Sequence, residues 1–264
     1  RTKYSLPELV QLWRERVKAI GIRDYLGVMA WDWGLPGRGR ASSFKYVKDA
    51  IPKYRKWGAT SYNAEINANW GTFGPATYVA TRLLWDGDND AQAAYDDFFA
   101  HAYGTADDEM KALYAMWAKS TALSPRNLHV WFQQLATAFE AAGEEGTDVQ
   151  ARLIDMAAYL HYARLFSRWE RALKTKDRER AYGALLPMLQ FTWRIRERQV
   201  VHSYALQRRL VNSGHPAVRP LKPHWRFNDP DAVWKHPQPL EDAELLAIFR
   251  SDLTAIAAEA EKAH

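Results

Sequence analysis

The first 86 residues alternate between helical and extended hydrophobic patterns. Short apolar runs with strand-like composition separate segments whose apolar side chains recur at helical spacing. Helix, strand, helix, strand, helix with short connections is typical of parallel βα units. The expected elements are helices over residues 6–20, 43–57 and 74–85, the last with Pro75 in its first turn, and strands over about 25–31 and 59–66.

After Asp86 the pattern predicts helices and no strand. Within the fifth of these helices Pro187 is expected to kink or break the helix. Residues 214–239 contain six prolines and predict an irregular segment. We therefore divide the chain into a βα part, 1–86, and a helical domain, 87–264. The helices are expected near 89–102, 105–122, 125–142, 147–174, 177–213 and 240–262.

Two parallel strands do not make a stable sheet alone. The expected fold class is therefore α/β followed by all-α: the last two βα units of a (β/α)8 TIM-type barrel and a C-terminal helical domain. The remaining strands would come from the rest of the same polypeptide or from another chain. Because the sequence begins at Arg1, we expect a processed or excised piece of a longer protein that could have lost a signal peptide.

Composition narrows the class of protein. The 264 residues are 47% hydrophobic and 25% charged, as in soluble globular chains, and no apolar run approaches the roughly 20 residues of a membrane span. The absence of cysteine excludes disulfides and zinc–thiolate sites, and the eight histidines show no HExxH or paired ligand spacing. We expect no metal, no cofactor and no membrane partner. Twelve tryptophans could stack on sugars, although most tryptophans in a helical protein fill the core.

Charge is distributed unevenly along the chain. Residues 160–226 carry fifteen Lys and Arg against four Asp and Glu, whereas residues 86–110 carry eight acids and no Lys or Arg. A basic stretch can mark nucleic-acid binding. Here the arginines are interleaved with Trp169, Trp193 and Tyr204 on amphipathic helices, without a nucleic-acid motif. We expect a solvated helix face, or one docked on the acidic part, and no nucleic-acid partner.

Two acids follow the predicted strands. Asp32 ends the apolar run of "GVMAWDWGLPG" (residues 27–37), and Glu65 lies near the end of the second strand. Strand alternation predicts that both point into the barrel at the C-terminal ends of neighbouring strands, where barrel enzymes carry their chemistry. Glycoside hydrolysis needs such a carboxylate pair. The alternative is that either acid only caps a loop or helix.

Aromatic and amide side chains surround these two acids in the sequence. Indole faces stack on the apolar faces of sugar rings, and amides can donate hydrogen bonds to the acids or to a sugar. At least one of the tryptophans is expected to line a sugar subsite. The expected substrate-binding residues are Trp31, Trp33, Asn63, Asn67, Asn69 and Trp70.

The stretch from Tyr62 to Met110 resembles a bacterial family, domain of unknown function 4838. The residues that carry this resemblance are Tyr78, Val79, Ala80, Arg82, Leu83, Leu84, Trp85 and Asp86, then Ala102, Tyr103, Gly104, Ala106 and Met110. The chain is more distantly similar to the α-glucuronidases of glycoside hydrolase family 67 through Ala68, Asn69, Trp70, Gly71, Phe73, Gly74, Arg82, Leu83 and Trp85, with an insertion between Gly74 and Arg82. The similarity covers roughly residues 25–115.

The resemblance implies roles for the two acids. Asp32 and Glu65 match the late Asp and Glu pair that would handle the water nucleophile, and the general acid would lie outside this chain. We therefore expect the C-terminal part of a secreted or periplasmic glycoside hydrolase, α-glucuronidase-like, acting on an oligosaccharide or polysaccharide. Two other classes stay open: a non-catalytic carbohydrate-binding module, and a helical interaction module whose basic helices, 147–213, bind a partner or form a homodimer.

Overall fold

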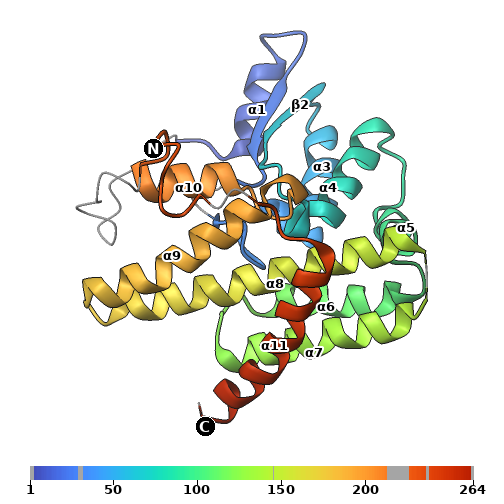
Figure 1. Ribbon diagram of the computed structural model, residues 1–264. Helices are drawn as coiled ribbons and strands as arrows, with labels where there is room; N and C mark the ends of the chain where they lie inside the picture. The colour runs from blue at the N-terminus through green and yellow to red at the C-terminus, as the bar shows by residue number, and fades with distance from the viewer. Residues whose placement is uncertain (1–2, 29–31, 145, 213–225, 236–237, 263–264) are drawn as a thin grey trace.

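The computed structural model describes residues 3–28, 32–144, 146–212, 226–235 and 238–262. A small βα part at the N-terminal end lies beside a larger array of helices (Figure 1). The βα part contains α1 (Leu6–Arg14), β1 (Gly21–Tyr25), the 3₁₀ turn η1 (Arg40–Ser42), α3 (Phe44–Lys56), β2 (Ser61–Glu65) and α4 (Trp70–Trp85). The helical part contains α5 (Ala91–Tyr103), η2 (Gly104–Ala106), α6 (Asp107–Lys119), α7 (Pro125–Ala142), α8 (Thr147–Lys174), α9 (Arg178–Arg194), η3 (Arg196–Arg198), α10 (Ser203–Asn212) and α11 (Asp242–Glu261).

The sheet has two parallel strands. Gly21 pairs with Ser61 at one end and Tyr25 pairs with Glu65 at the other. Alternate residues of each strand are more buried and include Asp24 and Tyr62, which contact Tyr46 and Tyr54 of α3; the residues between them are exposed to solvent. The predicted βα order is thus confirmed, although the described residues contain only this two-stranded sheet. The second strand is shorter than the expected 59–66.

The first strand lies at Gly21–Tyr25 and not at 25–31, so that prediction is wrong. The strand contains a buried carboxylate, Asp24, which the Tyr46 hydroxyl (2.7 Å), the Tyr62 hydroxyl (3.0 Å) and the Arg40 guanidinium all contact as donors. Burial acts to raise the pKa of Asp24, but these hydrogen bonds outweigh it and hold the pKa below its usual value. Hydrogen-bond donors distant in sequence therefore allow a segment that contains a buried carboxylate to form a strand.

The side-chain alternation of the first strand is also opposite to the prediction. Tyr25 and its strand partner Glu65 share the exposed face. Leu26 lies buried against Ala41 and Phe73, among the residues that the helices cover. In a strand over 25–31, side-chain alternation would place Leu26 on the same face as Asp32, and therefore on the inward face expected for Glu65. Asp32 lies beyond the strand, with its N–H directed to the Val28 carbonyl at 3.3 Å, so strand alternation does not determine where its carboxylate points.

The helical part is organised around α8. This 28-residue helix crosses the molecule and packs against α7, α9 and α11 (Figure 1). The core along it is rich in large aromatic side chains with less than 2% exposure, including Tyr159, Tyr162 and Phe166, which themselves belong to α8. The described residues after Asp86 contain no strand, as predicted. No helix in the described ranges is long and apolar enough to cross a membrane.

Some helix boundaries agree with the predictions and others do not. The structure places α7 and α8 at the expected residues, whereas α4 begins at Trp70, so Pro75 lies inside the helix and not in its first turn. The helix expected over 177–213 is divided into α9 and α10. The break falls after Arg194 and not at Pro187, where α9 continues for seven more residues. Much of the proline-rich segment 214–239 lies outside the described residues, but its Trp234 is fully buried.

Candidate functional site

The loop that follows β1 is held against the middle of α8. The hydroxyl of Tyr159 donates to the Gly34 carbonyl at 2.8 Å, and the hydroxyl of Tyr162 donates to the Trp33 carbonyl at 2.6 Å. Both tyrosines are fully buried. Trp33 has φ 57°, in the left-handed region that few non-glycine residues adopt. Contacts with the helical part therefore fix the conformation of the loop that carries Asp32.

Asp32 is a buried acid in this loop, with 2% exposure. Burial raises the pKa of its carboxyl group, and the Gly34 N–H, which donates to Oδ1 at 2.8 Å, offsets part of that increase. A carboxyl group with a raised pKa can exchange a proton nearer to neutral pH than an ordinary aspartate can. The bond to Gly34 is also a local loop cap. The geometry therefore fits proton transfer and a structural role alike.

A hollow of about 370 Å³ lies beside Asp32. Gly39, with φ 81°, forms part of its wall, and a Cβ atom there would lie 3.0 Å from Oδ2 of Asp32. A larger residue at position 39 would therefore crowd the carboxyl group and strain the backbone. The hollow is a place where a small group could reach the acid. Its lining residues are Tyr25, Leu26, Gly27, Val28, Asp32, Gly39 and Arg40.

Glu65 lies at the end of β2 on the exposed face of the sheet, where it forms an ion pair with Arg23 of β1. Its backbone carbonyl accepts from the N–H groups of Leu26 (2.9 Å) and Gly27 (3.3 Å), so the end of β2 adjoins the residues that line the hollow. The Glu65 side chain is not among those lining residues. Glu65 thus ends β2, while Asp32 lies in the loop after the adjacent parallel strand β1; Asp32 is buried and Glu65 is exposed.

The predicted aromatic residues contact the helical part. Trp33 is half-buried and packs against Phe166 and Trp169, with ring centroids 6.0 and 6.4 Å away. Trp70 is half-buried as well, and its indole N–H donates to the Arg198 carbonyl at 3.2 Å. These contacts indicate packing roles for both indoles. The third predicted tryptophan, Trp31, lies outside the described residues.

The predicted asparagines differ in their surroundings. Asn63 is exposed on the same face of the sheet as Glu65. Asn69, just before α4, is 1% exposed, and neither its side-chain oxygen nor its nitrogen has a hydrogen-bond partner among the described residues; the same holds for the Asn67 side-chain nitrogen. Buried amides without partners are costly. A ligand or a bound water that paired with Asn67 and Asn69 would remove that cost.

Sequence reasoning missed the polar cluster around Asp24. Besides Asp24, the cluster contains Arg40, Tyr46 and Tyr62, and Tyr54 lies 3.2 Å from Tyr46 through their hydroxyl groups. Burial and the neighbouring carboxylate raise the pKa of both Tyr46 and Tyr62, which keeps the hydroxyls protonated as donors. A buried acid inside a strand could have signalled the cluster, had the strand been placed correctly. No group of three His, Asp or Glu side chains in the described ranges could hold a metal ion.

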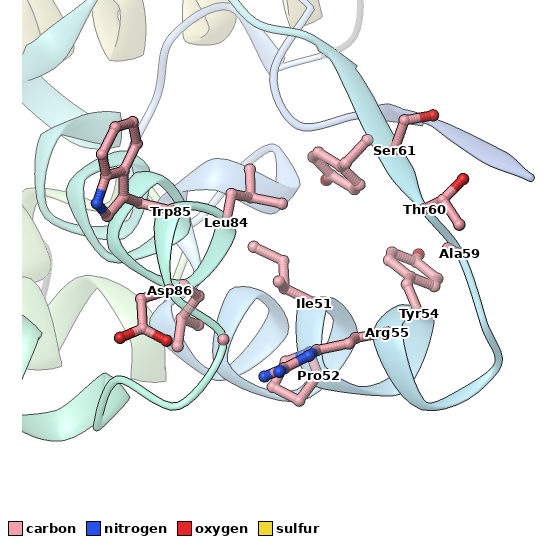
Figure 2. A pocket seen from close by; sticks show the side chains of 13 residues that line it. Ile51, Pro52, Tyr54, Arg55, Ala59, Thr60, Ser61, Leu84, Trp85 and Asp86 are labelled. Carbon is pink, nitrogen blue, oxygen red and sulfur yellow. The ribbon is translucent and has the colours of Figure 1, made fainter. Parts of the chain in front are cut away.

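A different hollow, of about 520 Å³, lies at the opposite end of β2 from Glu65 (Figure 2). Residues from α3, from the start of β2 and from the end of α4 form its walls. Leu84 and Trp85 border it and are exposed to solvent, at 46% and 92% respectively. The hollow is therefore remote from both candidate acids and is bordered by apolar groups that the described residues leave uncovered.

Comparisons with known proteins do not help to assign roles to these residues. No protein-family model, no curated protein and no solved structure matches the chain. The resemblance drawn from the sequence therefore stays a prediction.

Proposed function

We propose that this chain is the C-terminal part of a glycoside hydrolase that acts on an oligosaccharide or polysaccharide outside the cytoplasm. Asp32 and Glu65 would be its residues for activating water, in a barrel that further polypeptide completes. The observation that carries the proposal is the position of the two acids relative to adjacent parallel strands: Glu65 is the last residue of β2 and Asp32 lies in the loop after β1, at the end of the sheet where βα barrels hold their catalytic groups.

Uncovered apolar surface supports the completion of a barrel. The helix before β1 exposes Leu12 and Trp13, at 44% and 58%, and the helix after β2 exposes Leu84 and Trp85 at the hollow of Figure 2. In a parallel βα array such helix faces pack against the neighbouring strands. Apolar surface of this kind usually marks a place that another segment covers. Further strands on both sides of the sheet would cover these side chains.

The electrostatics of the site fit a role in activating water. A general base works best when its pKa lies near the working pH, and burial shifts the pKa of Asp32 in that direction. Glu65 lies at the solvent-exposed rim beside Arg23, where a substrate hydroxyl or a water could approach it. A general acid would still be needed to protonate the leaving oxygen. In the proposed enzyme that acid comes from a strand outside these residues.

A second candidate is a non-catalytic carbohydrate-binding module. It is favoured by the ion pair that occupies Glu65 and by the loop-capping bond of Asp32 to Gly34. In that case the unpaired amides of Asn67 and Asn69 would still bind sugar hydroxyls. The variant Asp32→Asn distinguishes the two functions. In an enzyme it would abolish turnover, whereas in a binding module it would leave the affinity for the sugar almost unchanged.

The test uses the complete polypeptide that supplies the further strands. Initial rates are measured on a panel of acidic and neutral oligosaccharides for Asp32→Asn, Glu65→Gln and the matched control Glu140→Gln, an exposed acid on α7. We expect kcat to fall by about two orders of magnitude or more in the first two variants, with circular dichroism unchanged, and to stay constant in the control. Full activity of either site variant would contradict the proposed roles.

A further inference from the structure

Arginines line a hollow in the helical part that is formed by residues of α8, α9 and α11. Its volume is about 350 Å³. We propose that this hollow, together with the one beside it, binds the anionic groups of an acidic oligosaccharide. The lining residues are Arg168, Arg171 and Ala172 of α8, Arg180 and Ala184 of α9, and Glu259 of α11.

Positive charge exceeds negative charge at this hollow. Glu259 accepts hydrogen bonds from Arg168 at 2.9 Å and from Arg164 at 2.7 Å, and it lies 3.5 Å from Arg171. Burial acts to raise the pKa of Glu259, but the arginines outweigh it and lower the pKa to about 2. Arg164 has a second carboxylate partner, Asp252, whereas among the described residues Arg168 and Arg171 pair with Glu259 alone. One carboxylate therefore cannot neutralise the guanidinium groups around it.

Arg180 adds a cation from the opposite wall. Its guanidinium forms no ion pair with any carboxylate of the described residues. The small side chains of Ala172 of α8 and Ala184 of α9 also line the hollow. A guanidinium group presents a planar set of donors that matches a carboxylate or sulfate group. The hollow thus offers unused donors next to room for an anion.

A second hollow, of about 670 Å³, adjoins the first through Arg171, which lines both. It adds Arg38 and Lys174, while Glu170 lies 3.5 Å from Arg38. Across both hollows, five cationic side chains face two carboxylates among the described lining residues. Charge spread over two adjoining hollows fits a ligand with several anionic groups better than a single small ion.

The chemistry of the walls favours a sugar acid over nucleic acid. Single-stranded nucleic acids are held by aromatic rings on which bases stack. The described residues that line the two hollows include no aromatic ring; apart from the charged groups they are serine, alanine, leucine and proline. The choice of a sugar backbone rests on the proposed function, whereas the selectivity for anions rests on the arginines alone.

The test is isothermal titration calorimetry of the full chain at low ionic strength. The probes are trigalacturonate, neutral maltotriose and a short single-stranded oligonucleotide. We compare the unmodified chain with Arg180→Ala, Arg171→Ala and the matched control Arg178→Ala. Arg178 is an exposed residue of the same helix as Arg180 and does not line the hollow.

We expect trigalacturonate to bind and maltotriose not to bind. Arg180→Ala should weaken binding by about tenfold, which is the loss of one charge-assisted hydrogen bond, Arg171→Ala by at least as much, and Arg178→Ala by less than about twofold. Absence of trigalacturonate binding, or equal weakening by Arg178→Ala, would overturn the site. Tighter binding of the oligonucleotide would overturn the choice of ligand. The variants Asp32→Asn and Glu65→Gln are not expected to change trigalacturonate binding at the arginine-lined hollow. The activity assay therefore tests the proposed function, and the calorimetry tests the anion site independently of it.

Discussion

Removing one hydroxyl group at a time tests how the Asp32 loop is held. Tyr159→Phe and Tyr162→Phe keep the aromatic rings in the core and delete the donors to the carbonyls of Gly34 and Trp33. Both donors are fully buried, Gly34 is buried and Trp33 is half-buried, so the deletion leaves each carbonyl without its tyrosine partner in a largely enclosed place. The perturbation is therefore a lost hydrogen bond with almost no change in packing volume.

The magnitude follows from these contacts. A buried polar group that loses its partner costs about 1–3 kcal/mol. Each variant should lower the free energy of unfolding by that amount, which corresponds to a fall in Tm of about 2–12 °C for a chain of this size. Because the two carbonyls are adjacent in one loop, the double variant should deviate from additivity. Tyr204→Phe is the control, since Tyr204 is 45% exposed, and it should change stability by less than about 0.5 kcal/mol.

Two measurements check the prediction. Chemical denaturation followed by tryptophan fluorescence gives the change in unfolding free energy for each variant. Limited trypsin digestion monitors cleavage after Arg38, which lies in the same loop, and should be faster in both variants under native conditions. If Tyr159→Phe and Tyr162→Phe behave like Tyr204→Phe in both assays, the loop is not held by these bonds and the reasoning is refuted.

Three further predictions concern buried or paired acids. Asp32→Asn should raise the free energy of unfolding at pH 7. Burial raises the pKa of Asp32 in the folded state, so the folded protein loses stability as pH rises and the acid ionises, whereas an amide carries no charge and its oxygen can still accept from Gly34. Urea unfolding of both proteins at pH 5 and pH 7 measures the difference. Asp252→Asn should cost about 1–3 kcal/mol, since the buried Arg164 loses one of its two carboxylate partners and keeps Glu259, and no loss in thermal unfolding would contradict the role of that ion pair. Glu259 has a folded-state pKa of about 2 against 4.5 for the ordinary group, so the stability that it contributes is present above about pH 4.5 and is lost as pH falls toward 2; Glu259→Gln should flatten the pH dependence of unfolding in that window.

The helix α7 could be predicted because its end signals are local. The Ser124 hydroxyl accepts the N–H of Asn127, Pro125 occupies the first turn, and Gly143 ends α7 with φ 50°. These residues lie within a few positions of the helix ends. Sequence patterns of this kind therefore place the ends of α7 at the residues where the structure has them.

The first strand could not be placed in the same way. Its sequence, GIRDY, contains Asp24, whose burial depends on donors that lie 16 to 38 residues further along the chain. The apolar run after Tyr25 has the composition of a strand but does not continue β1. Tertiary contacts determine the position of the strand. Because the strand was misplaced, the side-chain alternation derived from it, which would place Leu26 on the inward face, was wrong as well.

Pro187 shows a different limit of local reasoning. Proline removes the hydrogen bond to the carbonyl four residues earlier and crowds that carbonyl. That earlier residue is Gly183, which is exposed; apart from its chain neighbours and the backbone of its own helix, no atom of the described residues lies within 4 Å of a Cβ placed on it. Water can therefore satisfy the freed carbonyl, and α9 continues to Arg194. The free-energy cost of a proline inside a helix depends on whether the carbonyl four residues earlier is exposed to water, and the hydrophobic pattern of the sequence does not show that exposure.

For the candidate site, the sequence indicated which residues follow the strands but not how they are surrounded. Asp32 and Glu65 were recognisable as acids near strand ends. The burial of Asp32 against Gly39, the Arg23 partner of Glu65 and the unpaired amide of Asn69 all depend on segments that meet only in the folded chain. The packing of Trp33 on α8 has the same origin.

The bonds from α8 to the Asp32 loop also constrain the order of events during synthesis. Tyr159 and Tyr162 lie 125 and 129 residues after the carbonyls that they contact. At roughly 5–20 residues per second, a ribosome needs on the order of 10 s to make that length of chain. During this interval Gly34 and Trp33 have emerged without the helix that holds them. The loop beside Asp32 therefore reaches its final conformation only after α8 has been made, and until then its carbonyls bond to water or to whatever binds the nascent chain.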